Sequence, residues 1–219
     1  MTMTQHIASD DVLLRHSSGR LSAAHALVLD CHLEMSAEAR SRYSHMEALG
    51  GMLLEELPLA QVGDDLFEKT LARLNQPVVA TPRRVPHYDH QRLAMGVDVP
   101  TPLRHRQIGN WRWMGPGMRF ARIEMPEDPT INLVLLRIAA GQRMPEHGHS
   151  GKELTLILKG AFSDESGRYT VGDLAEEDGE TEHRPIVDTD GECICLASIE
   201  GPMRPHGWAA RLFQPFIGL

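Results

Sequence analysis

Short apolar or alternating runs fill most of the chain from Trp111 onward, and turn-forming residues separate them. No segment with a helical pattern of useful length lies between these runs. Many short strands joined by turns predict an antiparallel β-sandwich or barrel. The predicted strands are Trp111–Met114, Met118–Met125, Ile131–Ala139, Leu154–Leu158, Cys193–Ile199 and Leu212–Ile217.

The first 75 residues follow a helical pattern instead. Ser9, Ser22 and Ser36 each precede a segment with apolar residues at helical spacing, and serine at such a position caps the start of a helix. Asp64 or Asp65 occupies the same position before a fourth segment of this kind. This part of the chain is therefore predicted to form a module of about four helices.

Prolines interrupt the chain between these two regions. Five of them fall between Gln76 and Arg106, which rules out a long helix, and the same stretch carries five Arg against two Asp. A basic, proline-rich strip between two acidic segments indicates a linker. The predicted fold class is a multidomain α + β chain, with a helical domain at 1–75, a linker at 76–106 and an antiparallel β-sandwich or barrel at 107–219.

Charge and composition narrow the function classes. The chain of 219 residues has a formal net charge of -8, whereas proteins that bind nucleic acid concentrate Lys and Arg. No apolar run reaches the length of a membrane span, and the first residues lack the apolar core of a signal peptide. Three cysteines are too few for a secreted disulfide framework. We therefore expect a cytoplasmic protein that contacts neither nucleic acid nor membrane directly.

Two histidines and a glutamate follow each other at spacings that suit metal binding. His147 and His149 are two residues apart, so in a strand their imidazoles point to the same face. Glu153 has the same parity, and the intervening Gly151 allows a local turn. Two imidazoles and a carboxylate suit a borderline divalent metal ion.

This segment resembles the first cupin motif, and the second cupin motif follows it at the right spacing. The matching residues of the first motif are Gly141, His147, His149, Glu153 and Gly160. The second motif is matched by Gly172 and His183, and it departs from the family at Asp178, Glu180 and Val187, where Pro, Gly and Asn are usual. The resemblance implies a C-terminal cupin whose metal ligands are His147, His149, Glu153 and His183.

Zinc is the first candidate for this site, with iron, manganese or nickel as alternatives. A closed site with four protein ligands would only brace the barrel, whereas catalysis needs an open coordination position. We assign no catalytic residue and no further cofactor-binding residue. Cys193 and Cys195 also share one face of a predicted strand, either as small buried apolar residues or as a redox or metal pair.

The N-terminal region resembles the zinc-binding anti-sigma domain, whose pattern is an early His followed by H-x3-C-x2-C. His6 and His32 match the histidines, but Ser36 and Ala39 stand at the two cysteine positions. Neither can supply a thiolate, so we expect no zinc in this module. His6 is then interpreted as a mobile terminal residue and His32 as a residue on a helix surface.

The layout of an acidic helical module, a proline-rich linker and a cupin resembles ChrR-type anti-sigma factors. Three local strings also look like that family: residues 153–162, 193–197 and 212–216. The resemblance implies a protein that sequesters an extracytoplasmic-function (ECF) sigma factor with its helices and releases it on oxidative stress of the singlet-oxygen type, sensed with the cupin.

The rival interpretation is a cupin metalloenzyme, a dioxygenase or isomerase whose helices serve for dimerisation. The anti-sigma interpretation requires no turnover, and the sequence alone leaves open whether the chain is an enzyme. It also leaves open whether the chain forms a homo-oligomer.

Overall fold

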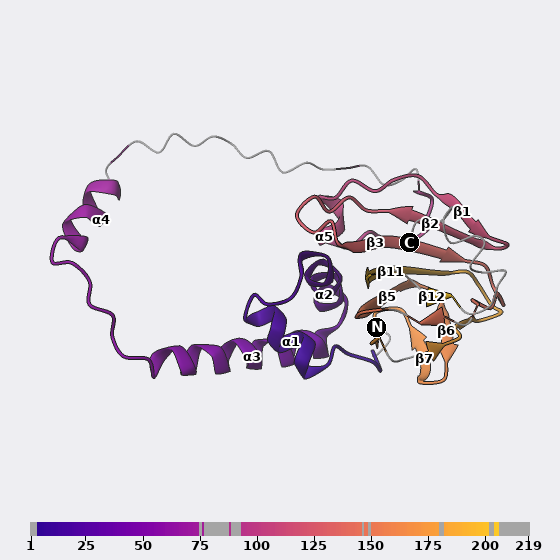
Figure 1. The fold of residues 1–219 in the computed structure, drawn as a ribbon, viewed down its shortest axis with the longest axis horizontal. Coiled ribbons are helices and arrows are strands. Elements are labelled where there is room, and N and C mark those ends of the chain that lie inside the picture. Colours follow the sequence, from indigo (N-terminus) through magenta and orange to yellow (C-terminus); the bar gives the residue numbers. More distant parts are fainter. Residues whose placement is uncertain are drawn as a thin grey trace.

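The structure is a computed structural model that describes residues 4–74, 76, 88, 93–145, 147–148, 150–179, 182–201 and 204–205. Within these ranges, helices come first and strands follow, as the sequence predicts (Figure 1). The helices are α1 (Asp10–Ser17), α2 (Ala23–Met35), α3 (Ala37–Glu55), α4 (Leu66–Leu74) and the short α5 (Thr101–Arg104).

The three predicted serine caps are confirmed. Each serine side chain accepts a hydrogen bond from the backbone N–H three residues later: Ser9 from Val12, Ser22 from His25, and Ser36 from Ala39. A cap of this kind satisfies a backbone donor that the helix itself leaves unpaired, and it is worth about 1 kcal/mol. The caps therefore fix where α1, α2 and α3 begin.

The strands form one large antiparallel sheet and two small ones, which together make the predicted sandwich. The order in the large sheet is β1-β2-β3-β11-β5-β8, and the small sheets are β10-β6-β7 and β12-β4-β9. The strands are β1 (Arg112–Gly115), β2 (Met118–Arg122), β3 (Ile131–Ile138), β4 (His147–Gly148), β5 (Glu153–Lys159), β6 (Ala161–Asp164), β7 (Gly167–Thr170), β8 (Leu174–Glu177), β9 (Glu182–His183), β10 (Ile186–Val187), β11 (Cys193–Glu200) and β12 (Arg204–Pro205).

The large sheet has a separate apolar core on each of its faces. On β5, Leu154, Leu156 and Leu158 join a core shared with the helices, whereas Ile157 joins the core inside the sandwich. Alternate residues of a strand point to opposite faces, so one strand serves both cores. Helix α2 packs against β3, β5 and β11 and contributes Leu27, Val28 and Leu29, among others, to the shared core. The helical region and the sheet are thus joined by buried apolar contacts.

The end of the proline-rich strip packs against the same core. Leu93, Met95 and Leu103 are buried there, and the indole N–H of Trp111 donates a hydrogen bond to the carbonyl oxygen of Leu93. The ammonium group of Lys159 donates to the carbonyl of Met95. Residues 77–87 lie outside the described residues, and the domain boundaries at 75 and 106 stay a prediction.

The second half of α3 and the whole of α4 extend away from the rest of the molecule (Figure 1). The only buried residue of α3 is Ala39, near the start of the helix, and α4 has none. Large apolar side chains are nevertheless frequent there, and we call them the α3–α4 apolar surface. Its members are Leu49, Met52, Leu53, Leu54, Leu57, Leu59, Val62, Leu66, Phe67, Leu71 and Leu74, each at least 43% exposed. Among the described helices, none has the length and apolar character that a bilayer span requires.

Candidate metal centre and the adjoining helical region

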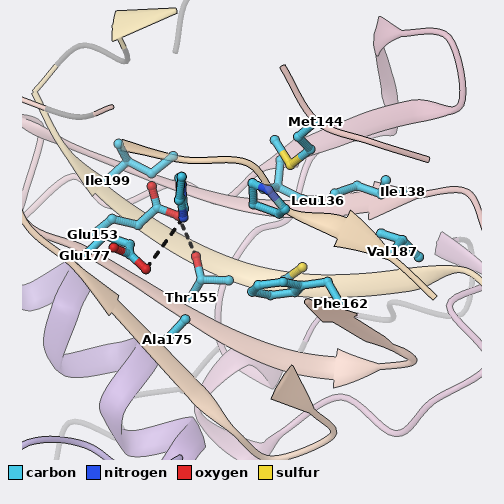
Figure 2. Close-up of a pocket in the computed structure, with 13 residues that line it drawn as sticks. Leu136, Ile138, Met144, Glu153, Thr155, Phe162, Ala175, Glu177, Val187 and Ile199 are labelled. Carbon is cyan, nitrogen blue, oxygen red and sulfur yellow. Dashed lines mark hydrogen bonds and ion pairs between the residues drawn. The ribbon is translucent and has the colours of Figure 1, made fainter. Parts of the chain in front are cut away.

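A small cavity lies inside the sandwich, polar at one end and apolar at the other (Figure 2). Glu153, Glu177 and Thr155 gather at the polar end, and Phe162 and Val187 lie at the apolar end. The cavity volume is about 30 Å³, which is room for one or two water molecules. Such a space suits a metal ion.

Two of the four predicted metal ligands line this cavity. Glu153 at the start of β5 and His183 at the end of β9 are both buried and both belong to the cavity wall. The hydroxyl group of Thr155 donates a hydrogen bond of 2.7 Å to Glu153 Oε1 and orients that carboxylate. His147 on β4 pairs through its backbone with His183, but its side chain and the whole of His149 lie outside the described residues.

Two carboxylates that the sequence analysis did not single out lie beside His183. Glu177 Oε1 is 3.6 Å from His183 Nδ1, and Asp164 Oδ2 is 3.8 Å from the same nitrogen. The ligand atoms of these three residues all lie within 4.8 Å of one another. Glu177 reaches the site because β8 pairs with β5 in a register that places it opposite Glu153. A pairing register between two strands is not visible in a single sequence.

Asp164 looks in the sequence like an ordinary turn residue. Its Oδ1 does accept hydrogen bonds from the backbone N–H groups of Ser166 and Gly167, which closes the β6–β7 hairpin. Its Oδ2 points the other way and is buried without a hydrogen-bond partner. One carboxylate therefore serves both the turn and the interior.

The acidic side chains make the electrostatic potential at this site negative. Burial alone would lower the pKa of His183, but the neighbouring Asp164 and Glu177 carboxylates outweigh burial and raise that pKa to about 10. Burial would raise the pKa of Asp164, and His183 together with the hairpin N–H groups lowers it instead. No Lys or Arg belongs to the described cavity wall. Carboxylate oxygens and an imidazole at a negative potential are suitable ligands for a divalent cation.

The two C-terminal cysteines belong to the inner core, and Cys195 also lines the cavity. Their sulfur atoms are 3.7 Å apart, and both residues are buried. The contact with Cys193, together with burial, raises the pKa of Cys195 well above its usual value. Both thiols thus share one strand face, as their spacing predicts, and Cys195 is protonated at neutral pH.

The interpretation of His32 as a helix-surface residue is wrong. His32 is fully buried, and both of its ring nitrogens are engaged. Its Nε2 accepts a hydrogen bond of 3.2 Å from the backbone N–H of Ala8, so its Nδ1 carries the proton and donates to the carbonyl oxygen of Gly172 at 2.9 Å. An imidazole bonded in this way has no lone pair left for zinc.

Ser36 and His6, which belong to the same degenerate zinc pattern, also make direct contacts with other residues. Ser36 shares a hydrogen bond of 2.8 Å with the hydroxyl of Thr4, in addition to capping α3. The ring of His6 lies 4.3 Å from the ring of Tyr169 on β7, so the structure places this terminal residue against the cupin. His32, Ser36 and His6 thus each contact a residue outside the zinc pattern.

Residues 4–9 run beside the edge strand β8 and fasten the helical region to it. Asp173 Oδ1 accepts hydrogen bonds from the backbone N–H groups of Gln5 and His6, and the N–H of Leu174 donates to the carbonyl of His6. Ser9 donates to Glu176 through both its backbone N–H and its hydroxyl, at 2.6 and 2.8 Å. The start of α1 is thereby tied to the strand that carries Glu177.

Comparisons with known proteins agree with this architecture. The family model of the ChrR cupin-like domain matches residues 104–202. The anti-sigma-E factor ChrR of Cereibacter sphaeroides is 35% identical over 222 aligned residues, which cover 99% of each chain. The crystal structure of Rhodobacter sphaeroides SigE in complex with the anti-sigma ChrR matches with a TM-score of 0.69 and 33% identity, over 90% of this chain and 100% of that chain. With this similarity over its whole length, the chain belongs to the ChrR family of anti-sigma factors.

Proposed function

We propose that this chain is an anti-sigma factor that sequesters an ECF sigma factor through its N-terminal helices and releases it when the cupin senses oxidative stress of the singlet-oxygen type. The observation that carries the proposal is the α3–α4 apolar surface. Monomeric proteins rarely expose large contiguous apolar patches unless a partner covers them. The similarity over the full length to a ChrR that was crystallised with SigE supports a sigma factor as that partner.

The α3–α4 apolar surface suits a clasp on another protein. Phe67 is 71% exposed and Leu53 is 58% exposed, and both belong to elements that Figure 1 shows extended from the body. Buried aromatic and aliphatic anchors supply most of the energy of an interface, whereas charges at its rim mainly set the encounter rate. A sigma factor held by these helices cannot present the covered surface to RNA polymerase. We place the complex in the cytoplasm, where transcription takes place.

The cupin is proposed to hold one divalent metal ion through His147, His149, Glu153 and His183, with zinc as the first candidate. Support comes from the cupin motif and from the cavity that contains Glu153 and His183. The bound ion would supply positive charge to a negatively charged cavity and a centre whose ligands respond to oxidants. The cupin-enzyme alternative is not favoured, because the relative that matches over the whole chain is an anti-sigma factor and the matching structure is its complex with SigE.

Strand β8 offers a direct route from the cavity to the helices. Ala175 and Glu177 face the inside of the sandwich, whereas Leu174 faces the core shared with the helices. Glu176 therefore points to the helices, where it accepts the two hydrogen bonds from Ser9. We infer that a change at the metal centre displaces β8 and thereby shifts the start of α1, which is hydrogen-bonded to Glu176.

The experiment that tests the proposed function is binding of the full chain to a purified ECF sigma factor from the same organism. A stable one-to-one complex in size-exclusion chromatography is expected. Leu53→Asp should weaken the complex at least tenfold, whereas Leu14→Asp should not, because Leu14 lies on α1 and outside the α3–α4 apolar surface although it is also 50% exposed. No complex with any ECF sigma factor of the organism would contradict the proposal.

A further inference from the structure

The spacing around His183 fits a shared ion better than direct hydrogen bonds. The distances of 3.6 and 3.8 Å from His183 Nδ1 to Glu177 and Asp164 are too long for hydrogen bonds. Two ligand atoms that each lie about 2.0–2.2 Å from one ion are separated by about 3–4 Å, depending on the angle at the ion. Glu177 and Asp164 are thus each spaced from His183 as two ligands of one ion are.

Asp164 Oδ2 is the clearest single indication. The side chain of Asp164 is 1% exposed, and its Oδ1 is held by the two hairpin N–H groups. This anchoring fixes the direction of Oδ2, which is buried without a hydrogen-bond partner and points at His183. A buried carboxylate oxygen left in this state is unfavourable unless a cation compensates it.

The charge balance of the cavity leads to the same conclusion. Glu177 and Asp164 both approach His183, and Glu153 lies opposite Glu177 in the pairing of β5 with β8. The described cavity wall contains no Lys or Arg. A divalent ion beside His183 would act on both neighbouring carboxylates at once and so balance their charge.

We propose that Asp164 and Glu177 are ligands of the cupin metal ion together with His183, in addition to the residues of the cupin motif. The proposal rests on the metal site of the proposed function and extends it. The number of candidate ligands rises from four to six, which exceeds what tetrahedral zinc takes. Because added carboxylates suit Mn²⁺ more than a histidine-rich set does, the centre should bind Mn²⁺ unusually well for a zinc-type cupin.

The test uses the full chain, its Glu177→Gln and Asp164→Asn variants, and Glu165→Gln as a matched control on the same hairpin, where the side chain is exposed. Competition with a chelating dye gives the affinities for Mn²⁺ and Zn²⁺. Each cavity variant should lose at least about tenfold in Mn²⁺ affinity and less in Zn²⁺ affinity, and the control should lose neither. Equal affinities in all four proteins would overturn the proposal.

Melting temperatures separate ligation from a structural ion pair with His183. In the presence of chelator, the melting temperature of each variant shows what the carboxylate contributes to the fold without an ion, through its contact with His183 and, for Asp164, through the hairpin hydrogen bonds. The increase that Mn²⁺ produces should shrink in both variants. A melting temperature that falls equally with chelator and with Mn²⁺ would mean that the carboxylates only hold His183 in place.

Two further measurements keep this inference distinct from the proposed cupin site. X-ray absorption on the Mn²⁺-loaded wild type should give more than four nitrogen or oxygen ligands, and four would contradict the inference without any variant. Glu153→Gln tests the motif itself. If that variant loses the ion while Glu177→Gln and Asp164→Asn keep it, this inference fails and the motif site stands. Failure of the wild type to bind either ion would overturn both.

Discussion

Replacing His32 by leucine tests whether hydrogen bonds have taken the place of the N-terminal zinc. Leucine keeps most of the buried volume but leaves the N–H of Ala8 and the carbonyl of Gly172 without their partner. A buried backbone group that loses its partner costs about 1–3 kcal/mol. The two losses together should lower the free energy of unfolding by about 2–6 kcal/mol, a large share of the 5–15 kcal/mol of a typical domain.

Urea denaturation of the full chain, with and without a chelator, measures this change. His45→Leu is the matched control, because His45 lies exposed on α3, and it should change stability by less than about 0.5 kcal/mol. The effect of His32→Leu should be equally large with chelator present, since no zinc is involved. A loss below about 1 kcal/mol, or a wild-type zinc equivalent that disappears in His32→Leu, would refute the reasoning.

Three further outcomes are expected. Burial lowers the pKa of His25 and His32, so the folded state favours their neutral forms. Their contribution to stability is complete above pH 6.5 and is lost as the pH falls below that value. Urea denaturation from pH 7.5 to 5 should therefore show a declining free energy of unfolding, and the decline should be smaller in His25→Asn. Ser9→Ala removes the α1 cap and the hydroxyl hydrogen bond to Glu176, while the backbone N–H bond to Glu176 remains, and it should cost about 1–2 kcal/mol in the same assay; no measurable cost would contradict a contribution of this side chain to the tie between α1 and β8. Phe67→Asp should weaken sigma binding by at least about 2 kcal/mol in a titration while leaving the melting temperature unchanged, and a reversed pattern would assign Phe67 to the fold.

Local signals made much of the fold predictable. The serine caps at Ser9, Ser22 and Ser36 and the short apolar runs of β5 and β11 are local features, so the sequence displays them directly. The cupin motif likewise indicated Glu153 and His183, which the structure brings to one cavity.

Long-range pairing was not predictable in the same way. Helix α2 is buried on most of its surface, between the other helices and the sheet, and an apolar pattern all around a helix does not reveal its neighbours. The burial of His32 depends on Gly172, which is 140 residues away in the sequence. Glu177 enters the cavity through the β5–β8 register, and Asp164 is brought beside His183 by the fixed hairpin. Each requires the tertiary structure.

The most direct test of the account is transcription in vitro from a promoter that needs the ECF sigma factor. Adding the metal-loaded full chain at one equivalent should stop transcription, and singlet oxygen from a photosensitiser should restore it. The restoration requires the affinity for the sigma factor to fall by about 10- to 100-fold, which corresponds to about 1.4–2.8 kcal/mol of coupling between the cupin and the helices. Glu153→Gln should still stop transcription but should not allow its restoration. A chain that leaves transcription unchanged at stoichiometric amounts, or normal restoration in Glu153→Gln, would contradict the account.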